Sequence, residues 1–373
     1  MPTGYAQWMY DWETRLTSVD NNRVVRPLEW GLEWTGSWPC RNGHGLGYVP
    51  DDPEKFLDDY NRRIVAASDE FYAYGKPTDF RLERREIQVF STREVPDPNL
   101  EAKVRGKYAD FLRFTSPVKT PHQENNLANA RWFPVRGRRA VVLLPHWNSD
   151  AIAYTGLCRA LNLLGISVLR LSMPYHDIRQ PAEIRRADYA VSANIARTLD
   201  AARQGVIDAR CCLDWLEQQG YGRLGILGTS LGSCYAFLTA AHDPRLRVAA
   251  FNHASTYVAD VVWHGQSTRH IREGLESRID LKRLRGLWSA ISPMSYFSQF
   301  ARWPKKSLII YAKYDLTFLP RLSQDAIDAF AQHHLDYKVV VLPCGHYTTG
   351  ETPYKFMDGW HLASFFRTAF ESI

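Results

Sequence analysis

Residues 224–242, LGILGTSLGSCYAFLTAAH, decide the fold of this chain. The apolar run 224–227 predicts a strand buried on both faces of a parallel sheet, and residues 231–242 predict the helix that follows it. Between them, residues 228–232, GTSLG, match the pattern G-x-S-x-G. In that setting a serine occupies a tight strand-to-helix turn, and the flanking glycines let neighbouring backbone pass close by. Ser230 is therefore the predicted nucleophile.

From about residue 80 onward, strand-like and helix-like segments alternate. Eight strands are predicted, over 86–90, 110–114, 140–144, 166–171, 224–227, 248–251, 308–311 and 339–342, and the last six of them are short apolar runs. Helical patterns lie between them, over 149–164, 187–219, 231–242, 320–334 and 355–370. This order predicts an α/β fold, in which helices flank a mostly parallel eight-stranded sheet. Ligand sites in such sheets lie at the carboxyl ends of the strands.

Two further residues follow Ser230 in the order expected for a nucleophile in this setting, acid first and then histidine. A serine is a weak nucleophile until an adjacent base takes its proton. His346 follows the last predicted strand, in a loop where Gly345 gives the turn room, and it is the predicted base. Asp315 comes just beyond strand 308–311 and is the predicted acid. Asp260, in the loop after the preceding strand, is the alternative acid.

An oxyanion hole should complete this site. One donor is expected to be the backbone N–H of Leu231, the residue after the nucleophile. The other should come from the loop 145–149, PHWNS, where the backbone N–H of Trp147 or of Asn148 is the candidate. Trp147 stands where this kind of loop usually has a glycine, so a bulky ring is expected at the mouth of the site. His146 of the same loop is a candidate substrate-pocket residue.

The roughly fifty residues 254–300 separate two of the predicted strands and hold several aromatic and histidine residues. They predict a helical lid that would exclude water and shape the pocket, with Trp263 and Trp288 as further pocket candidates. A plain surface excursion is the alternative.

Residues 1–78 are predicted to form an extension packed on the main domain, which covers 79–373. Five of the twelve tryptophans lie in the first 38 residues. Asp52 and Pro53 predict the cap and first turn of a helix that carries Phe56, Tyr60 and Ile64 near one face. These aromatics are expected to cover one side of the main domain, and a role in the substrate pocket or in a homodimer is the alternative.

The composition indicates which kinds of binding partner and which cellular compartment to expect. Of 373 residues, 45% are hydrophobic and 23% charged, and the formal net charge of +6 is scattered, so no nucleic-acid partner is predicted. No apolar run approaches the roughly 20 residues that span a membrane. The first 20 residues lack the apolar core of a secretory signal, and six cysteines without a CxxC pair predict buried thiols in a cytoplasmic protein. No cysteine or histidine cluster has structural-zinc spacing, so neither a metal nor another cofactor is predicted.

Together, these motifs resemble the α/β-hydrolase superfamily over about residues 80–373. A narrower resemblance, to a little-characterised abhydrolase-domain family (the DUF2048 type), is carried by residues 213–222, LDWLEQQGYG, and 173–175, MPY. The resemblance implies a cofactor-free serine hydrolase that cleaves a small-molecule carboxylic ester through an acyl-enzyme. The same site could serve a thioesterase, amidase, peptidase or acyltransferase. A non-catalytic ligand-binding protein with this fold is the alternative from another class.

Overall fold

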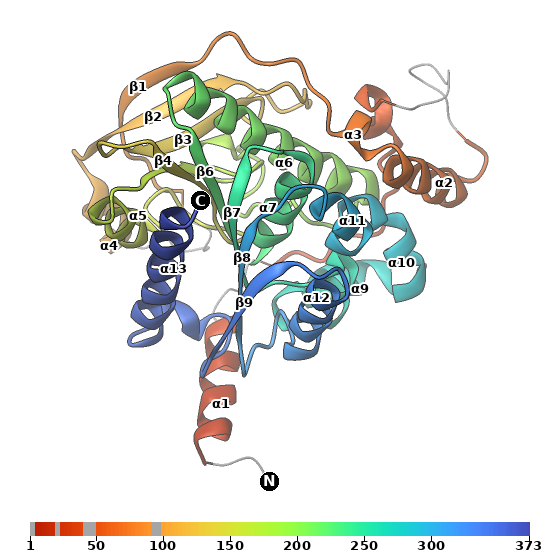
Figure 1. Cartoon of the computed structure of the whole chain (residues 1–373). Coiled ribbons are helices and arrows are strands. Elements are labelled where there is room, and N and C mark those ends of the chain that lie inside the picture. The colour runs from red at the N-terminus through yellow and green to blue at the C-terminus, as the bar shows by residue number, and fades with distance from the viewer. Residues whose placement is uncertain (1–3, 19–22, 40–49, 91–97) are drawn as a thin grey trace.

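The computed structural model describes residues 4–18, 23–39, 50–90 and 98–373, and its centre is a nine-stranded sheet (Figure 1). The strand order is β1-β2-β3-β5-β4-β6-β7-β8-β9. Strands β4 to β9 pair in parallel, whereas β1, β2, β3 and β5 pair antiparallel with one another in that order. This arrangement confirms the predicted α/β fold. The strands are β1 (Arg81–Glu86), β2 (Tyr108–Thr115), β3 (Leu127–Phe133), β4 (Arg139–Leu144), β5 (Ser167–Leu171), β6 (Arg223–Thr229), β7 (Leu246–Asn252), β8 (Lys306–Ala312) and β9 (Asp336–Leu342).

The predicted number of eight strands is wrong, because β3 has no continuous apolar run. Its Asn129 and Arg131 are buried, and each finds a partner inside the protein. Asn129 donates to the Ser172 hydroxyl at 3.3 Å and Arg131 to the Thr155 hydroxyl at 3.1 Å. The first strand is also displaced, since β1 ends at Glu86, where the predicted strand 86–90 begins. Charged residues fill β1, which lies at the sheet edge, where charge discourages pairing with other chains.

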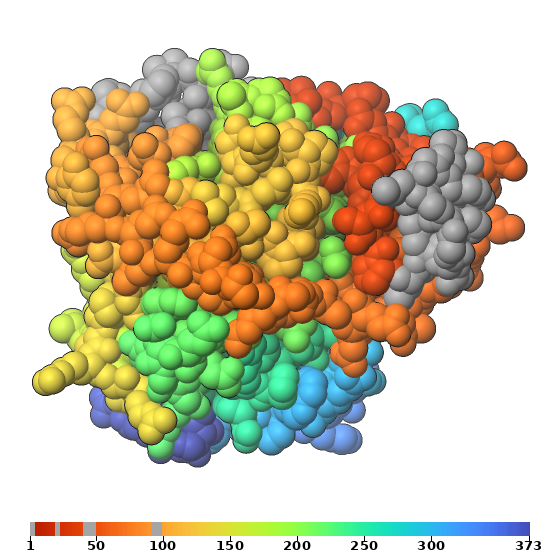
Figure 2. Space-filling model, turned by 90° about the horizontal axis from the view of Figure 1, so that it is seen from above, coloured from red at the N-terminus to blue at the C-terminus, as the bar shows by residue number. Residues whose placement is uncertain are grey.

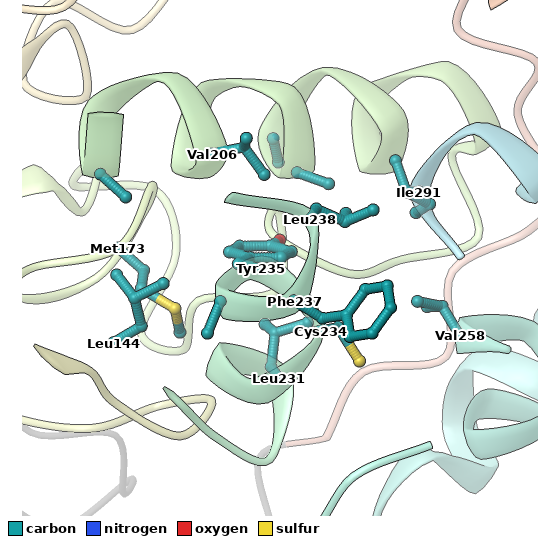
Figure 3. Close-up of a cluster of buried hydrophobic side chains, with 14 of the residues drawn as sticks. Leu144, Met173, Val206, Leu231, Cys234, Tyr235, Phe237, Leu238, Val258 and Ile291 are labelled. Carbon is teal, nitrogen blue, oxygen red and sulfur yellow. The ribbon is translucent and has the colours of Figure 1, made fainter. Parts of the chain in front are cut away.

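Helices cover both faces of the sheet. One face packs against α6 (Ile195–Gln218), α7 (Leu231–His242) and α12 (Pro320–Gln332), and the other against α5 (Thr155–Leu163) and α13 (Tyr354–Glu371). The predicted helices 149–164 and 187–219 begin later than expected, because turns occupy their first residues. Apolar side chains of α6 and α7 face one another in the core, among them Val206 of α6 and Leu238 of α7 (Figure 3). A Cβ atom at Gly205 of α6 would lie 2.7 Å from the Tyr235 ring of α7, so this glycine permits the close approach.

The N-terminal segments pack at two separate places on the sheet domain. Helix α1 (Gly4–Ser18) lies beside the turn after β9, whereas η1 (Leu32–Ser37), α2 (Pro53–Ala66) and α3 (Ser68–Phe71) lie near α6 and α10. Asp52 caps α2, as predicted, by accepting from the Lys55 N–H at 3.0 Å. Buried Trp38 stacks on Tyr60, and its indole donates to Asp200 of α6 at 2.7 Å. Seen from above, the orange segment between α3 and β1 lies on the surface, next to yellow and green segments that come later in the chain (Figure 2).

Residues 254–300 form a run of short helices: α8 (Val258–His264), η3 (Gln266–Thr268), α9 (Arg269–Leu275), α10 (Leu281–Leu287), η4 (Ser289–Ile291), η5 (Pro293–Tyr296) and α11 (Phe297–Phe300). No helix in the described ranges is long and apolar enough to cross a membrane. The described cysteines are buried free thiols, as predicted, and Cys40 lies outside the described residues. The domain boundary at residue 78, the lid, the homodimer and the cytoplasmic location stay predictions.

Candidate active site

Ser230 occupies a strained turn between β6 and α7. Its backbone has φ 57° and ψ −122°, a conformation that a residue with a side chain adopts only when its surroundings enforce it. The two glycines of the motif provide those surroundings. A Cβ atom at Gly228 would lie 2.1 Å from the Gly232 carbonyl oxygen, and one at Gly232 would lie 2.2 Å from the Leu144 carbonyl oxygen. The Ser230 N–H donates to the Asn252 carbonyl at 2.8 Å, which ties the turn to β7.

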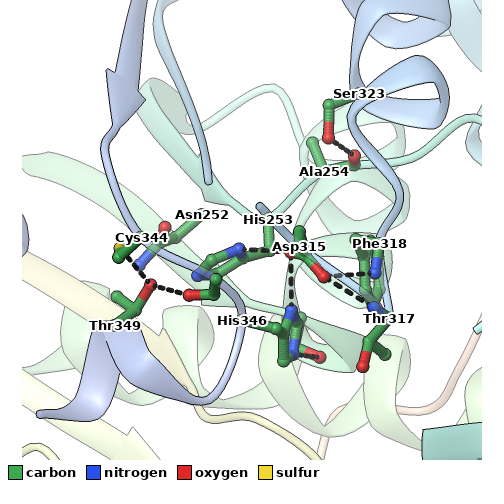
Figure 4. Close-up of polar contacts among 12 residues, drawn as sticks. Asn252, His253, Ala254, Asp315, Thr317, Phe318, Ser323, Cys344, His346 and Thr349 are labelled. Atoms are coloured by element: carbon green, nitrogen blue, oxygen red, sulfur yellow. Dashed lines mark hydrogen bonds and ion pairs between the residues drawn. The ribbon is translucent and has the colours of Figure 1, made fainter. Parts of the chain in front are cut away.

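A hydrogen-bonded chain joins the three residues that the sequence singles out. His346 Nε2 lies 3.0 Å from Ser230 Oγ, and His346 Nδ1 lies 2.9 Å from Asp315 Oδ2. The second Asp315 oxygen accepts the backbone N–H groups of Thr317 and Phe318, each at 2.7 Å (Figure 4). Asp315 is only 1% exposed, and the Phe318 ring stacks on the His346 ring at 5.3 Å. These contacts fix both the carboxylate and the imidazole plane.

The alternative acid, Asp260, lies in a different environment. It belongs to α8, and its carboxylate accepts two bonds from the Arg285 guanidinium, with Nε at 2.8 Å. Asp260 therefore pairs with the Arg285 cation, whereas His346 hydrogen-bonds to Asp315.

Asp315 and His346 each favour the charged form of the other. Burial alone would raise the pKa of Asp315, but the His346 imidazole and the hydrogen bonds from His253 and His346 outweigh it and hold this pKa well below its usual range. Burial alone would lower the pKa of His346, but the Asp315 carboxylate raises it above the ordinary 6.5. An ionised Asp315 accepts at both histidines, so His346 Nδ1 carries the proton and Nε2 faces Ser230 as a proton acceptor.

Two backbone N–H groups near Ser230 are available to a ligand. Those of Leu231 and Trp147 have no hydrogen-bond partner among the described residues. The N–H of Asn148 donates to His176 Nε2 at 3.0 Å, so the prediction of Asn148 as a donor is wrong. Asn148 has φ 61°, and this left-handed turn directs its N–H to the buried His176. The Trp147 ring stacks on His270, with 4° between the planes.

Ser230 and His346 open into a large cavity of about 1330 Å³. His146, a predicted pocket residue, lines it and lies 2.7 Å from the Tyr154 hydroxyl through Nδ1. Burial, followed by the nearby His346, lowers the pKa of His146 to about 3, so this imidazole is neutral. Apolar side chains form part of the wall: Ala153, Leu157, Ala160, Val191, Val258, Val261, Val262 and Phe318.

The other two predicted pocket residues do not line this cavity, and that prediction is wrong. Trp288 is fully buried in the core, where its indole N–H donates to the Ile195 carbonyl at 3.3 Å. Trp263 lies half-buried with the Arg272 guanidinium 5.4 Å above its ring. Helix α8 turns Val258, Val261 and Val262 toward the cavity instead, so Trp263 projects from another face.

Comparison with known proteins agrees with this architecture. The family model described as alpha/beta hydrolase domain containing 18 matches residues 156–286, which include β5, α6, β6 and Ser230. Acetyl xylan esterase 1 from Thermoanaerobacterium sp. JW/SL YS485 superimposes with a TM-score of 0.54 at 16% identity, over 86% of this chain and 94% of that one. The acetyl xylan esterase from Paenibacillus sp. R4 gives 0.53 at 12% identity, over 84% and 94%. No curated protein matches the sequence. The chain has the α/β-hydrolase fold.

A second histidine, His253, also hydrogen-bonds to the Asp315 carboxylate. Buried His253, just after β7, lies 2.9 Å from Asp315 Oδ2 through Nδ1, and its ring centre is 4.4 Å from that of His346. Burial and the nearby His346 lower the pKa of His253, so it is a neutral donor. His253 was missed in the sequence, although its place at the carboxyl end of a parallel strand is the signal that could have found it. Within the described ranges, His253, Asp315 and His346 form the one group whose ligand atoms, within 4.8 Å, could hold a metal ion, and they are hydrogen-bonded to one another.

A second buried carboxyl group, that of Asp358, lines the cavity beside Ser230, and it was not predicted from the sequence. Asp358 of α13 accepts from the Asn252 amide nitrogen at 3.0 Å through both oxygens. Burial raises its pKa to about 7. Since the Asn252 carbonyl holds the Ser230 N–H, two hydrogen bonds connect Asp358 to the nucleophile turn. Nothing in the helical pattern of 355–370 distinguishes this aspartate from a surface residue.

Proposed function

We propose that this protein is a serine hydrolase that cleaves carboxylic esters through an acyl-enzyme. The observation that carries the proposal is the hydrogen-bonded chain from Asp315 through His346 to Ser230. His346 Nε2 takes the proton as Ser230 Oγ attacks the acyl carbonyl, and it then protonates the leaving alcohol. Water, deprotonated by the same nitrogen, attacks the acyl-enzyme and releases the acid. Asp315 keeps the imidazole in the required tautomer and stabilises its charged form.

The negative charge that develops on the acyl oxygen needs its own donors. We assign to that oxygen the backbone N–H groups of Leu231 and Trp147, for which the described part of the chain offers no other acceptor. Helix α7 begins at Leu231, so its N-terminus adds a favourable partial positive charge. One such donor typically contributes roughly 10²- to 10³-fold in kcat.

The cavity favours an ester with at least one large apolar part. Its volume of about 1330 Å³ exceeds the roughly 300–1,000 Å³ of most small-molecule sites. Apolar side chains form part of the walls, and the segment 254–300 supplies three of them through Val258, Val261 and Val262. Both fold neighbours are named acetyl xylan esterases, which favours an ester substrate over a thioester or an amide. In this proposal, the segment 254–300 is the lid of the site.

Fluorophosphonate labelling of the full chain tests the nucleophile. We expect the wild type and Ser364→Ala to be labelled and Ser230→Ala to remain unlabelled, because Ser230 Oγ lies 3.0 Å from Nε2 of the His346 base. Ser364 is the matched control, since it also lines the cavity. Hydrolysis of p-nitrophenyl esters of increasing acyl length, compared with matched thioesters and anilides, then identifies the bond. A folded wild type without labelling or turnover would instead support a non-catalytic ligand-binding protein.

A further inference from the structure

Helix α1 contributes one buried acidic side chain to the loop that carries His346. Glu13 is fully buried, although glutamate is rarely found inside proteins without a partner. Its Oε1 accepts the Tyr347 N–H at 2.8 Å, and its Oε2 accepts the Thr348 N–H at 2.9 Å. The Thr348 hydroxyl donates to Oε2 at 3.1 Å and accepts the Gly345 N–H at 2.6 Å. The carboxylate therefore holds the backbone directly after His346.

The loop is shaped around this carboxylate. A Cβ atom at Gly345 would lie 2.4 Å from Glu13 Cδ and Oε2, so no larger residue fits there while Glu13 is in place. Aromatic contacts anchor the rest of α1 on both sides of the loop. Tyr10 packs edge-on against Tyr314, the residue before the acid, and Trp12 packs against Tyr354 of α13.

We propose that Glu13 is a positioning residue of the active site, which acts on Ser230 chemistry through the placement and charge environment of His346. This inference rests on the proposed function. Three N–H or O–H donors converge on two carboxylate oxygens, which is the pattern that an ionised carboxylate accepts. A 1 Å displacement of a reacting group can cost up to about 10²-fold in rate. The N-terminal extension thus reaches the catalytic base from about 330 residues away in the sequence.

The charges around His346 give this role a measurable signature. The negative groups that face it are Asp315 and Glu13, and both favour its charged form. The other titratable groups nearby, His253 and His146, have pKa values that burial lowers, which favours their neutral forms. Glu13 itself faces His346, Asp315 and the Cys344 thiol. Burial raises the pKa of Glu13 above the ordinary 4.5, and the N–H groups of Tyr347 and Thr348 and the His346 imidazole oppose this shift. Removal of the Glu13 charge therefore lowers the pKa of His346, and the base loses its proton at a lower pH.

The test is the rate of inactivation of the full-length protein by a fluorophosphonate, measured from pH 5 to 9. For Glu13→Gln we expect the high-pH plateau to fall about tenfold, because a Gln amide nitrogen cannot accept an N–H. We also expect its acidic limb to move down by roughly half a pH unit. Asp11→Asn is the matched control, because Asp11 is an exposed acid on the same helix, and it should keep the wild-type plateau and limb.

A second variant separates position from charge and covers the case in which Glu13→Gln does not fold. Thr348→Val removes the hydroxyl that links Gly345 to Glu13 but keeps the carboxylate. We expect its plateau to fall severalfold while the acidic limb stays at the wild-type pH. Thermal unfolding establishes that each variant is folded. A folded Glu13→Gln with the profile of Asp11→Asn, or a Thr348→Val with the wild-type plateau, would overturn the inference, whereas an unreactive wild type would overturn the proposed function itself.

Discussion

The nucleophile turn and the histidine loop form two halves of one site, but they are held in place by different means. Ser230 is fixed by its immediate neighbours, since Gly228 and Gly232 let β6 and α7 close around it. His346 is fixed by Asp315, 31 residues earlier, while the amide of the next residue is held by Glu13 of α1, 334 residues earlier. A constraint between neighbours leaves a motif in the sequence. A constraint across the fold leaves only single residues that resemble any surface aspartate or glutamate.

The largest effect is expected on the histidine side, from Asp315→Asn. An asparagine in that position presents an amide that no longer stabilises the imidazolium, and it permits the wrong tautomer of His346. We expect kcat to fall about 10⁴-fold, or about 5.4 kcal/mol in the activation free energy. We also expect the folded variant to lose about 1–3 kcal/mol of stability, because an amide nitrogen cannot accept the hydrogen bonds that the buried carboxylate oxygen accepts. Steady-state turnover of the best p-nitrophenyl ester measures the fall in kcat.

Asp260→Asn provides the comparison for that experiment. Its carboxylate pairs with Arg285 and not with His346, so we expect turnover near the wild-type value. Because the Asp260 side chain is only 2% exposed, this variant should lose about 1–3 kcal/mol of stability. A nearly active Asp315→Asn together with an inactive Asp260→Asn would transfer the role of acid to Asp260.

On the nucleophile side, the next largest effect is expected from Gly232→Ala. The new Cβ atom would lie 2.2 Å from the Leu144 carbonyl oxygen and 2.5 Å from the Pro145 carbonyl oxygen, so the backbone of β4 or α7 must move. We expect the free energy of unfolding to fall by about 3 kcal/mol, the upper part of the range for overpacking. Urea unfolding of both forms measures it.

Gly359→Ala is the control for this substitution. Gly359 lies within α13, and a Cβ atom there meets nothing within 4 Å. Alanine favours a helix over glycine by up to about 1 kcal/mol, so this variant should be slightly more stable than the wild type. Equal stability of Gly232→Ala and the wild type would mean that the turn does not depend on its glycines.

This difference between the two halves also explains what the sequence could predict. Residues 224–242 predicted β6, the turn and α7, because their periodicity and their glycines act over a few residues. Strand β3 escaped prediction because its buried Asn129 and Arg131 are paired with Ser172 and Thr155, which only the fold brings near.

The same reason accounts for the site residues that were missed or misplaced. His253, Asp358 and Glu13 carry no local pattern, since their partners come from other elements. Trp288 was predicted in the pocket because its segment is rich in aromatics, but the position of a single ring inside or outside a cavity depends on packing. Asn148 failed as a donor for a similar reason, since its N–H partner, His176, lies on the next loop.

The smallest effect we predict is in the pH dependence of kcat/KM. His346 must be neutral to accept the Ser230 proton, so activity falls as the pH drops through its pKa. Burial lowers that pKa, but the Asp315 carboxylate outweighs burial and raises it above 6.5, so the acidic limb of the wild type should lie above pH 6.5. A pH-stat assay with a neutral ester measures the acidic limb, because p-nitrophenol itself titrates in this range.

In the residual activity of Asp315→Asn, the acidic limb should move to lower pH, since the charge that holds the proton on His346 is gone. A limb at the same pH in both proteins would mean that another group titrates, and the buried Asp358, whose pKa burial raises to about 7, would be the next one to test.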